Sequence, residues 1–499
     1  MKRRLRVPPA PEVMAMLYAE YLRTEKCQNL SFRQYLEVVG YSDPSRDVEG
    51  MDDGDVFHRS AEGPELIRIP NQPITGIIRV KVLLVDFEDK EGFVRPQNYE
   101  DLLFSKNTYP TGSMRDYYHE VSLGNVDITG TVHGWIRMPR PYSFYTNKES
   151  GQNWYSYPRN AQGMAEDAVR AAIEHGVVFE PELDKLNQGM VTALFIIHAG
   201  RGAEELHPSV RGTEIWSHKW VMQRPVKVSP DMDATIYLMV PHDCKLGVCA
   251  HELGHLAFQW QDFYDPNYDK DGKEWSGSGK WDLMAGGSYN GGSVSPAHPA
   301  GLHKAQHRWI DTELVTTSKT VTLNPYTATS GKVLKIVSPR YKQNQYLILE
   351  NRIRTNFDTY LPGEGLLVWR VDESGEMLAP DLPGLLLIQA DGKHELEQNW
   401  DQGDGGDPFP GMTGRSQLGD TGDISTSFPE QERSGVSLSN IRRDPVTGNV
   451  SLDVKFELDG VTPPTIVSGE VSPFIQIPDD NPTGVSSAIS LTNQVRQRI

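Results

Sequence analysis

The sequence predicts an α+β protein with more than one compact region, and three observations support that prediction. A near-continuous apolar run, IIRVKVLLVDF at residues 77–87, has the β-branched character of a buried strand. Residues 162–175 place apolar side chains at four-residue spacing, as an amphipathic helix does. After about residue 316 only short strand-like runs follow, separated by Gly, Pro and Asp clusters. The first part therefore mixes helices and strands, and the second part is β-rich.

The first 60 residues are expected to form an accessory segment. Residues 12–39 have a helix-compatible pattern, and the acidic stretch DVEGMDDGD at residues 47–55 resembles a linker. The basic start is followed by no apolar run of the length found in signal peptides, so no signal peptide is expected. A first globular region is then expected over residues 61–315, and its second apolar strand is VTALFIIHAG at residues 191–200.

The β-rich region is expected over residues 316–459. Its strand-like runs are TVTLNPY, KVLKIVS, YLILENR, GLLVWRV and VSLDVKF, and they fit a β-sandwich-like domain. The last 40 residues, 460–499, contain several Pro, Ser and Thr and show little periodicity, so an extended or disordered tail is expected.

Composition excludes some functional classes. The chain has 499 residues with 67 Asp+Glu against 49 Lys+Arg, a formal charge of −18, which would repel phosphate backbones and argues against nucleic acid as a partner. No apolar stretch is long enough to predict a membrane span. The three cysteines, Cys27, Cys244 and Cys249, are too few for a disulfide scaffold, and the sequence fixes neither their state nor the oligomeric state.

The segment GVCAHELGHLAFQW contains the motif that predicts chemistry. His251 and His255 are four residues apart, which on a helix brings two imidazoles onto one face at the separation needed to share one zinc ion. Glu252 would lie beside the metal, where it can act as general base for a zinc-activated water. The motif predicts metal-assisted hydrolysis, although chance alone gives HExxH in roughly one or two per cent of chains of this length.

Two features after the motif strengthen the prediction. Tetrahedral zinc needs a third protein ligand, and Asp262 offers a carboxylate seven residues beyond His255. The Gly-rich turn GSGKWDLMAGGSYNG then carries Met284, which could form a hydrophobic floor under the metal, and the alternative is a plain surface loop with a buried methionine.

Seven segments in order resemble the immune inhibitor A family of bacterial zinc metallopeptidases over roughly residues 75–455. They are VLLVDFEDK, SMRDYYHEVSLGNVDITGTVHGW, FIIHAGRGAEE with IWSHKW, the HELGH helix, KWDLMAGGSYN, YLILENR with LPGEGLLVWRVDE, and GDGGDPFPG. The resemblance implies a metzincin-like zinc-peptidase catalytic domain with Met284 in its Met-turn, followed by a β-rich domain. It also implies protein or peptide substrates and a secreted or extracellular location. Family members are typically made with a removable pro-region, which residues 1–60 resemble, and whether these residues are cleaved stays open. Because no signal peptide is visible, a cytoplasmic location stays open.

The chain departs from the family pattern just after the second histidine. The family typically has glycine three residues after this histidine and aspartate three residues beyond that, where this chain has Phe258 and Gln261. A one-residue insertion would make Asp262 the third zinc ligand. Gln261 is the less favoured alternative, because a neutral amide is a poor zinc ligand. A turn that needs positive φ would be strained at Phe258.

Further site candidates are weaker. Two clusters could bind calcium or be solvated acidic turns, and they comprise Asp265, Asn267, Asp269 and Asp271 in the first and Asp401, Asp404 and Asp407 in the second. Cys27 could cap the zinc of a latent form, although a free cysteine is more often buried. Tyr289 could stabilise the oxyanion of a peptide-hydrolysis intermediate.

The sequence therefore favours a zinc-dependent endopeptidase. Two alternatives stay open: a catalytically silent relative acting as a binding or surface-interaction module, and a zinc hydrolase acting on small molecules. The natural substrate and its subsite preferences are not encoded in any pattern that the sequence displays.

Overall fold

The architecture is that of a mixed α+β protein, seen in a computed structural model. The structure describes residues 10–23, 30–41, 56–60, 63–67, 72–264, 275–373, 384–422 and 424–457. Asp265, Asn267, Asp269, Asp271 and Cys27 lie outside these ranges, as does the expected tail at residues 460–499.

The first region is built on a five-stranded sheet of order β4-β3-β5-β7-β6. The strands are β3 (Gly76–Asp86), β4 (Val126–Arg137), β5 (Leu194–His198), β6 (His218–Ser229) and β7 (Met232–Pro241). All neighbours pair in parallel except β6, which runs antiparallel to β7 at the edge. The apolar runs that predicted strands at residues 77–87 and 191–200 lie in β3 and β5.

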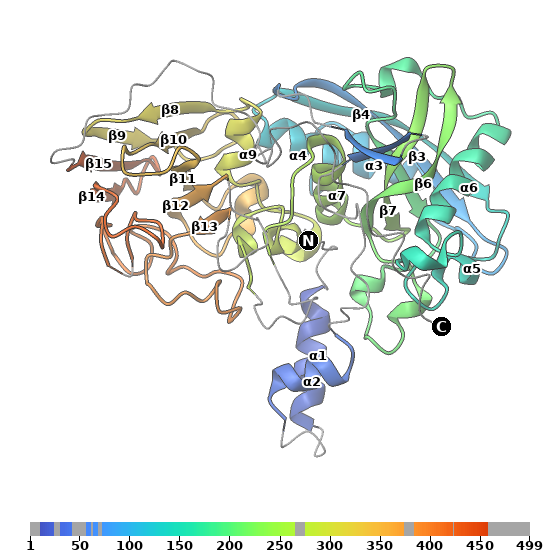
Figure 1. Cartoon of the computed structure of the whole chain (residues 1–499), viewed down its shortest axis with the longest axis horizontal. Helices are drawn as coiled ribbons and strands as arrows, with labels where there is room; N and C mark the ends of the chain where they lie inside the picture. The colour runs from blue at the N-terminus through green and yellow to red at the C-terminus, as the bar shows by residue number, and fades with distance from the viewer. Residues whose placement is uncertain are drawn as a thin grey trace, which may run out of the picture.

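Helices cover this sheet and connect its strands. They are α3 (Pro96–Phe104), α4 (Met114–Val121), α5 (Tyr142–Thr146), α6 (Ala161–Glu174) and α7 (Leu246–Phe258), followed by the short α8 (Asn290–Ser293) and α9 (Gly301–Gln306). The helix expected at residues 162–175 is α6, which begins after Asn160, whose side chain accepts a hydrogen bond from the Gly163 amide. Figure 1 shows α7 at the centre of the molecule, between this sheet and the β-rich region.

Two sheets form the β-rich region on the other side of α7 (Figure 1). The five-stranded sheet has the order β13-β12-β11-β10-β8 and the three-stranded sheet the order β14-β15-β9. Their strands are β8 (Asp311–Val315), β9 (Lys319–Leu323), β10 (Lys332–Ile336), β11 (Gln345–Arg352), β12 (Gly365–Asp372), β13 (Leu385–Leu387), β14 (Val436–Arg443) and β15 (Val450–Phe456). Each of the five predicted runs overlaps one of these strands, whereas β8, β13 and β14 were not foreseen.

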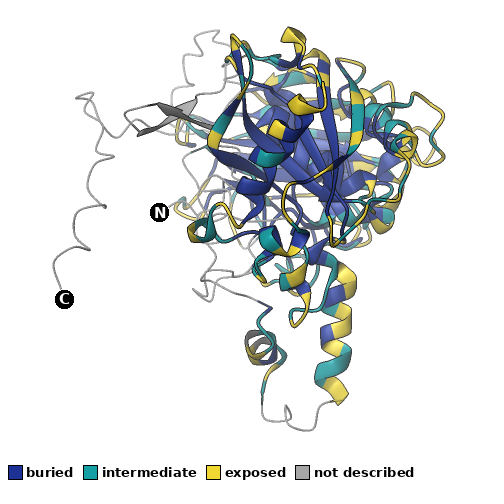
Figure 2. Ribbon diagram, turned by 90° about the vertical axis from the view of Figure 1, so that its right-hand side faces the viewer, coloured by how far each residue is buried: buried dark blue, intermediate teal, exposed yellow. Residues whose placement is uncertain are grey.

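Both faces of the larger sheet are buried, and they belong to different cores. Alternate residues of β11 and β12 join the main core that also contains the first sheet and α7; these are Tyr346, Ile348, Leu367, Trp369 and Val371. Their neighbours join a second core shared with the three-stranded sheet; these are Leu347, Leu349, Leu366 and Val368. Period-two alternation therefore packs one face of the larger sheet against the first region and the other against β9, β14 and β15. Figure 2 shows the strands at the centre of the molecule as buried.

The N-terminal segment forms two helices rather than one. These are α1 (Pro11–Arg23) and α2 (Phe32–Val38), which form a small apolar cluster of their own with Tyr289 packed against it. A two-stranded hairpin, β1 (Val56–Ser60) with β2 (Gly63–Ile67), comes next. None of the helices in the described part of the chain combines the length and apolar character needed to cross a bilayer.

Short 3-10 turns complete the fold, and three of them concern the site. They are η5 (Ala203–Glu205), η7 (Gly279–Trp281) and η8 (Gly286–Tyr289). The others are η3 (Trp154–Ser156), η4 (Pro181–Leu183), η6 (Arg211–Thr213) and η9 (Asn356–Tyr360).

Candidate metal centre

The HELGH segment lies on α7, a helix whose residues are all buried. The helix packs against β7 and η8, and the Tyr118 hydroxyl of α4 donates to the Ala250 carbonyl at 2.6 Å. His251, Glu252 and His255 are each 0% exposed. The position of α7 between two packed regions thus withdraws all three polar side chains from solvent.

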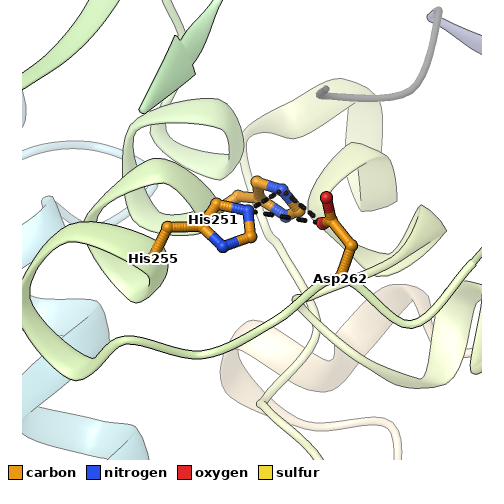
Figure 3. Close-up of side chains that lie close together, drawn as sticks. All are labelled: His251, His255 and Asp262. Carbon is orange, nitrogen blue, oxygen red and sulfur yellow. Dashed lines mark hydrogen bonds and ion pairs between the residues drawn. The ribbon is translucent and has the colours of Figure 1, made fainter. Parts of the chain in front are cut away.

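Two imidazoles and a carboxylate converge on one point beside α7 (Figure 3). His251 Nε2 lies 3.1 Å from His255 Nε2. Asp262 Oδ1 lies 3.1 Å from His251 Nε2 and 3.3 Å from His255 Nε2. Two nitrogens bound to one tetrahedral zinc at about 2.0–2.1 Å would be ~3.3 Å apart. The spacing of the three donor atoms therefore fits a tetrahedral metal ion.

Backbone carbonyls fix which ring nitrogens face the convergence point. His251 Nδ1 donates to the Leu283 carbonyl at 2.8 Å, and His255 Nδ1 donates to the Trp260 carbonyl at 2.7 Å. Because a carbonyl only accepts, each Nδ1 carries the proton, and in a neutral ring Nε2 presents its lone pair. Both lone pairs then face each other and a carboxylate, an arrangement that is repulsive without a cation between them.

The protonation states suit a metal site. Burial lowers the pKa of His255, which favours the neutral ring. Burial alone would raise the pKa of Asp262, but the adjacent His255 and His251 outweigh it and lower the pKa, so the carboxylate stays charged. Asp262 is 1% exposed, and apart from these two imidazoles no described residue hydrogen-bonds to its carboxylate. The donor set is thus two imidazoles and one anion, a set typical of zinc.

The turn after α7 explains why Asp262 rather than Gln261 reaches the histidines. The residue with left-handed geometry is Gln259, with φ 56° and ψ 34°, and its amide caps the helix on the Gly254 carbonyl. The expectation of strain at Phe258 is wrong, because the helix continues through Phe258 and turns one residue later. The chain then brings the Asp262 carboxylate, buried, to the two imidazoles, while Gln261 stays half-buried.

Met284 lies against the same helix. A methyl group added at Gly254 would lie 2.8 Å from Met284 Sδ and 3.0 Å from Trp260 Cε3, so the sulfur and the indole pack directly on the α7 backbone between the two histidines. The Met284 carbonyl accepts from the Phe263 amide at 3.0 Å. Tyr289 ends η8, is half-buried, and packs against the main core and the N-terminal cluster.

The acidic loop of the β-rich region has a different arrangement from the predicted one. Asp391, Glu395 and Asp404 have carboxylates within 4.8 Å of one another, with the Lys393 ammonium 2.8 Å from Asp391 and 3.7 Å from Asp404. Asp407 instead accepts from the Trp281 indole and the Asp404 amide, and Asp401 accepts from the Gly403 amide. Calcium binding by Asp401, Asp404 and Asp407 stays a prediction, as does binding by the first cluster, which lies outside the described residues. Cys244 and Cys249 are free thiols.

Sequence reasoning missed the partners that orient the histidines. The Leu283 and Trp260 carbonyls are backbone groups, which carry no residue-type signal. It also missed Asp391 and Glu395, although they lie shortly before the GDGGDPFPG segment. Arg352 is a further residue that it passed over, and the charged residues ending the otherwise apolar strand YLILENR were the available signal.

Comparison with known proteins agrees with this geometry. Residues 80–316 match the family described as immune inhibitor A peptidase M6, catalytic domain. The chain is 27% identical over 256 residues to immune inhibitor A of Bacillus thuringiensis subsp. alesti, covering 43% of this chain and 36% of that protein. It is 29% identical over 227 residues to the pre-pro-metalloprotease PrtV of Vibrio cholerae serotype O1 strain M66-2, covering 39% of this chain and 24% of that protein. The aligned part thus spans about a third or less of the length of these relatives. The match includes α7 and Met284, so residues 80–316 are similar to the M6 catalytic domain of the immune inhibitor A peptidase family.

Proposed function

We propose that this protein is a zinc-dependent endopeptidase that hydrolyses internal bonds of proteins or peptides. The observation that carries the proposal is the convergence of His251 Nε2, His255 Nε2 and Asp262 Oδ1 at 3.1–3.3 Å on the HELGH helix. The match to a peptidase family over residues 80–316 supports the reaction class, and the donor set supports zinc as the metal. Asp262 is the proposed third ligand.

The roles of the side chains follow from their positions. Bound zinc would supply Lewis acidity and lower the pKa of the attacking water. Glu252, next to His251 on α7, takes a proton from that water at its carboxylate and passes it to the leaving amine nitrogen as the peptide C–N bond breaks. The Tyr289 hydroxyl is proposed to donate to the scissile carbonyl oxygen, where negative charge develops.

The finer fold description belongs to the same proposal. A helix bearing both histidines, the packing of Met284 against Gly254 and an antiparallel strand at the sheet edge support a metzincin-like catalytic domain at residues 61–315. The core shared by the two C-terminal sheets supports a β-sandwich-like domain at residues 316–459, although β8 pairs with β10 and extends that sheet back to Asp311.

Substrate access and location are further parts of the proposal. The metal-site side chains are at most 1% exposed, so a peptide reaches them only after a rearrangement. Residues 1–60 are proposed as a removable pro-region, because α1 contacts η5 and its cluster packs against Tyr289. Secretion is proposed from the family resemblance, and calcium at the acidic loop is proposed from its carboxylates.

The decisive experiment compares wild type with Glu252→Gln and Glu252→Ala. Zinc content, casein cleavage and the N-terminal sequence of the active species would be measured for each preparation. We expect all three proteins to bind zinc equally and only the wild type to cleave casein, because the variants keep the ligands and lose the base. Equal zinc loading with no cleavage even by wild type freed of residues 1–60 would favour the silent binding module. Cleavage of small amides but not of casein would favour a small-molecule hydrolase, and a folded wild type without zinc would overturn the site assignment.

A further inference from the structure

The turn η7 forms three hydrogen bonds with the β-rich region. Arg352 Nη1 donates to the Trp281 carbonyl at 3.0 Å, and the Trp281 indole donates to Asp407 Oδ2 at 2.8 Å. The Lys280 amide donates to the Gln402 carbonyl at 2.7 Å. Arg352 ends β11, whereas Gln402 and Asp407 belong to one acidic loop, yet all three bonds involve one short turn. Two separate segments of the β-rich region thus hold η7.

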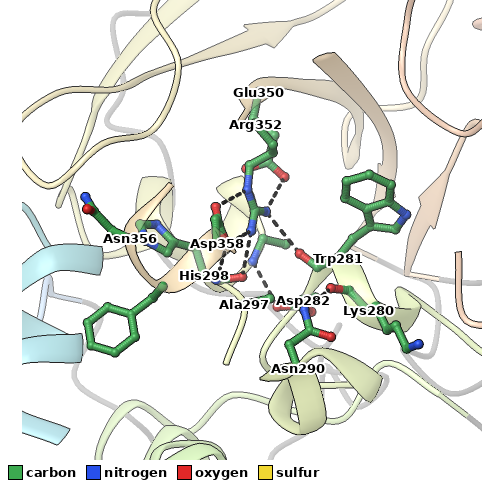
Figure 4. Close-up of polar contacts among 12 residues, drawn as sticks. Lys280, Trp281, Asp282, Asn290, Ala297, His298, Glu350, Arg352, Asn356 and Asp358 are labelled. Atoms are coloured by element: carbon green, nitrogen blue, oxygen red, sulfur yellow. Dashed lines mark hydrogen bonds and ion pairs between the residues drawn. The ribbon is translucent and has the colours of Figure 1, made fainter. Parts of the chain in front are cut away.

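Arg352 is the buried centre of this contact (Figure 4). It is the last residue of β11, is 0% exposed, and forms a two-point ion pair with Asp358 through Nε at 2.8 Å and Nη2 at 2.7 Å. Its Nη2 also donates to the His298 carbonyl at 3.3 Å. Burial alone would raise the pKa of Asp358, but Arg352 outweighs it and lowers this pKa to about 2. A planar guanidinium fixed by a two-point ion pair presents Nη1 in a fixed orientation, in which it donates to the Trp281 carbonyl and, at 3.5 Å, to Glu350 Oε1.

The Trp281 carbonyl is close in sequence to a partner of the metal site. Leu283, whose carbonyl accepts from His251 Nδ1 at 2.8 Å, is two residues further along. Between Trp281 and Leu283, Asp282 accepts hydrogen bonds from the Ala300 amide and the Ser278 hydroxyl, which both belong to the first region. Arg352 therefore fixes one end of a three-residue stretch whose other end orients His251.

We propose that Arg352 is a positioning residue for the metal-ligating imidazole of His251, acting from the β-rich region through the Trp281 carbonyl. The inference rests on the proposed metal site and adds that the β-rich region is an integral part of it. Outer partners that orient a ligating histidine typically change metal affinity about 10- to 100-fold when lost. Arg352 acts one step further out, so a weakening of about 3- to 10-fold is expected.

The test must separate positioning from simple unfolding. Removing Arg352 alone would leave Asp358 and Glu350 buried without their cation, so the main variant is the charge-balanced Arg352→Gln/Asp358→Asn pair. Arg352→Lys keeps the charge but lacks the planar fork, which makes it the conservative second variant. The matched control is Trp369→Phe, which removes the indole bond to Glu350 in the same buried network and leaves the Trp281 contact intact.

The readouts are zinc affinity, from competition with a chromophoric chelator, and the visible absorption spectrum of the Co²⁺-substituted protein. Full-length protein is used, and far-UV circular dichroism checks folding. The expected result is weaker zinc binding and an altered Co²⁺ spectrum for the pair and for Arg352→Lys, with Trp369→Phe like wild type. Folded variants with wild-type zinc affinity and spectrum would overturn the inference, as would an equal loss in the control. Wild type that binds zinc without cleaving peptides would refute the proposed activity alone, whereas wild type that binds neither metal would overturn both.

Discussion

Replacing Gly254 with alanine tests whether the packing under α7 sets the geometry of the metal site. The new methyl group would lie 2.8 Å from Met284 Sδ, 3.3 Å from Met284 Cε and 3.0 Å from Trp260 Cε3. Both side chains are buried, and the Trp260 carbonyl is the group that orients His255. A shift of Trp260 would therefore move the group that orients His255, a proposed metal ligand.

The size of the effect follows from two opposing terms. Alanine in place of glycine in a helix interior stabilises by about 1 kcal/mol. Overpacking a filled core costs about 1–3 kcal/mol. The net expectation is a loss of about 0–2 kcal/mol in unfolding free energy. If Trp260 moves, zinc affinity should fall about 10- to 100-fold, since an outer partner of His255 is displaced.

Gly254→Ala would be assayed by thermal unfolding, zinc titration and kcat/KM for peptide cleavage. Gly419→Ala is the matched control, because its added methyl meets nothing nearer than 3.7 Å. Gly254→Ala combined with Met284→Val removes the clash with the thioether and should recover part of the zinc affinity. If Gly254→Ala alone is more stable than wild type and binds zinc with unchanged affinity, the reasoning is refuted. Helix propensity would then outweigh the packing contact, and that contact would not set the geometry of the site.

Three further outcomes are expected. Asp262→Asn should weaken zinc by more than the about 10- to 100-fold typical of an outer partner, whereas Gln261→Ala should leave zinc titrations unchanged; the reverse pattern would exchange the two assignments. Burial raises the pKa of Asp407 to about 7, so the folded state favours its protonated form and loses stability as pH rises from about 4 to 7. Asp407→Asn, which can still accept from the Trp281 indole, should therefore raise the free energy of unfolding at pH 8 in EDTA by an amount on the order of 4 kcal/mol or less, and no gain there would contradict the burial argument. Burial lowers the pKa of Lys304 to about 7. Burying the charged ammonium therefore lowers the free energy of unfolding below pH 7, and this loss disappears as pH rises toward 10.5. The free energy of unfolding of wild type should increase by about 2 kcal/mol relative to that of Lys304→Met between pH 7 and 9. Unfolding free energies of the two proteins that change in parallel with pH would contradict this.

Local patterns in the sequence predicted much of the fold. The apolar run at residues 77–87 became β3, and the five C-terminal runs each became a strand, because burial on a sheet demands β-branched and apolar residues locally. The pattern at residues 12–39 did not decide between one helix and two. The strand β14, VSLSNIRR, has too many polar residues to be recognised from the sequence. It pairs with β15, and only its alternate side chains are buried in the second core, so the others can be polar.

The sequence by itself determined the part of the proposed metal site that depends on short spacing. His251 and His255 share a helix face because four residues make about one turn, and the resemblance to the immune inhibitor A family is confirmed by the match over residues 80–316. Only the tertiary structure decided what orients these ligands. The Leu283 carbonyl that accepts from His251 is 32 residues away, and Arg352 is 71 residues from the Trp281 carbonyl it binds. Such contacts depend on how distant segments pack, and a backbone carbonyl has no residue type by which a sequence could reveal it.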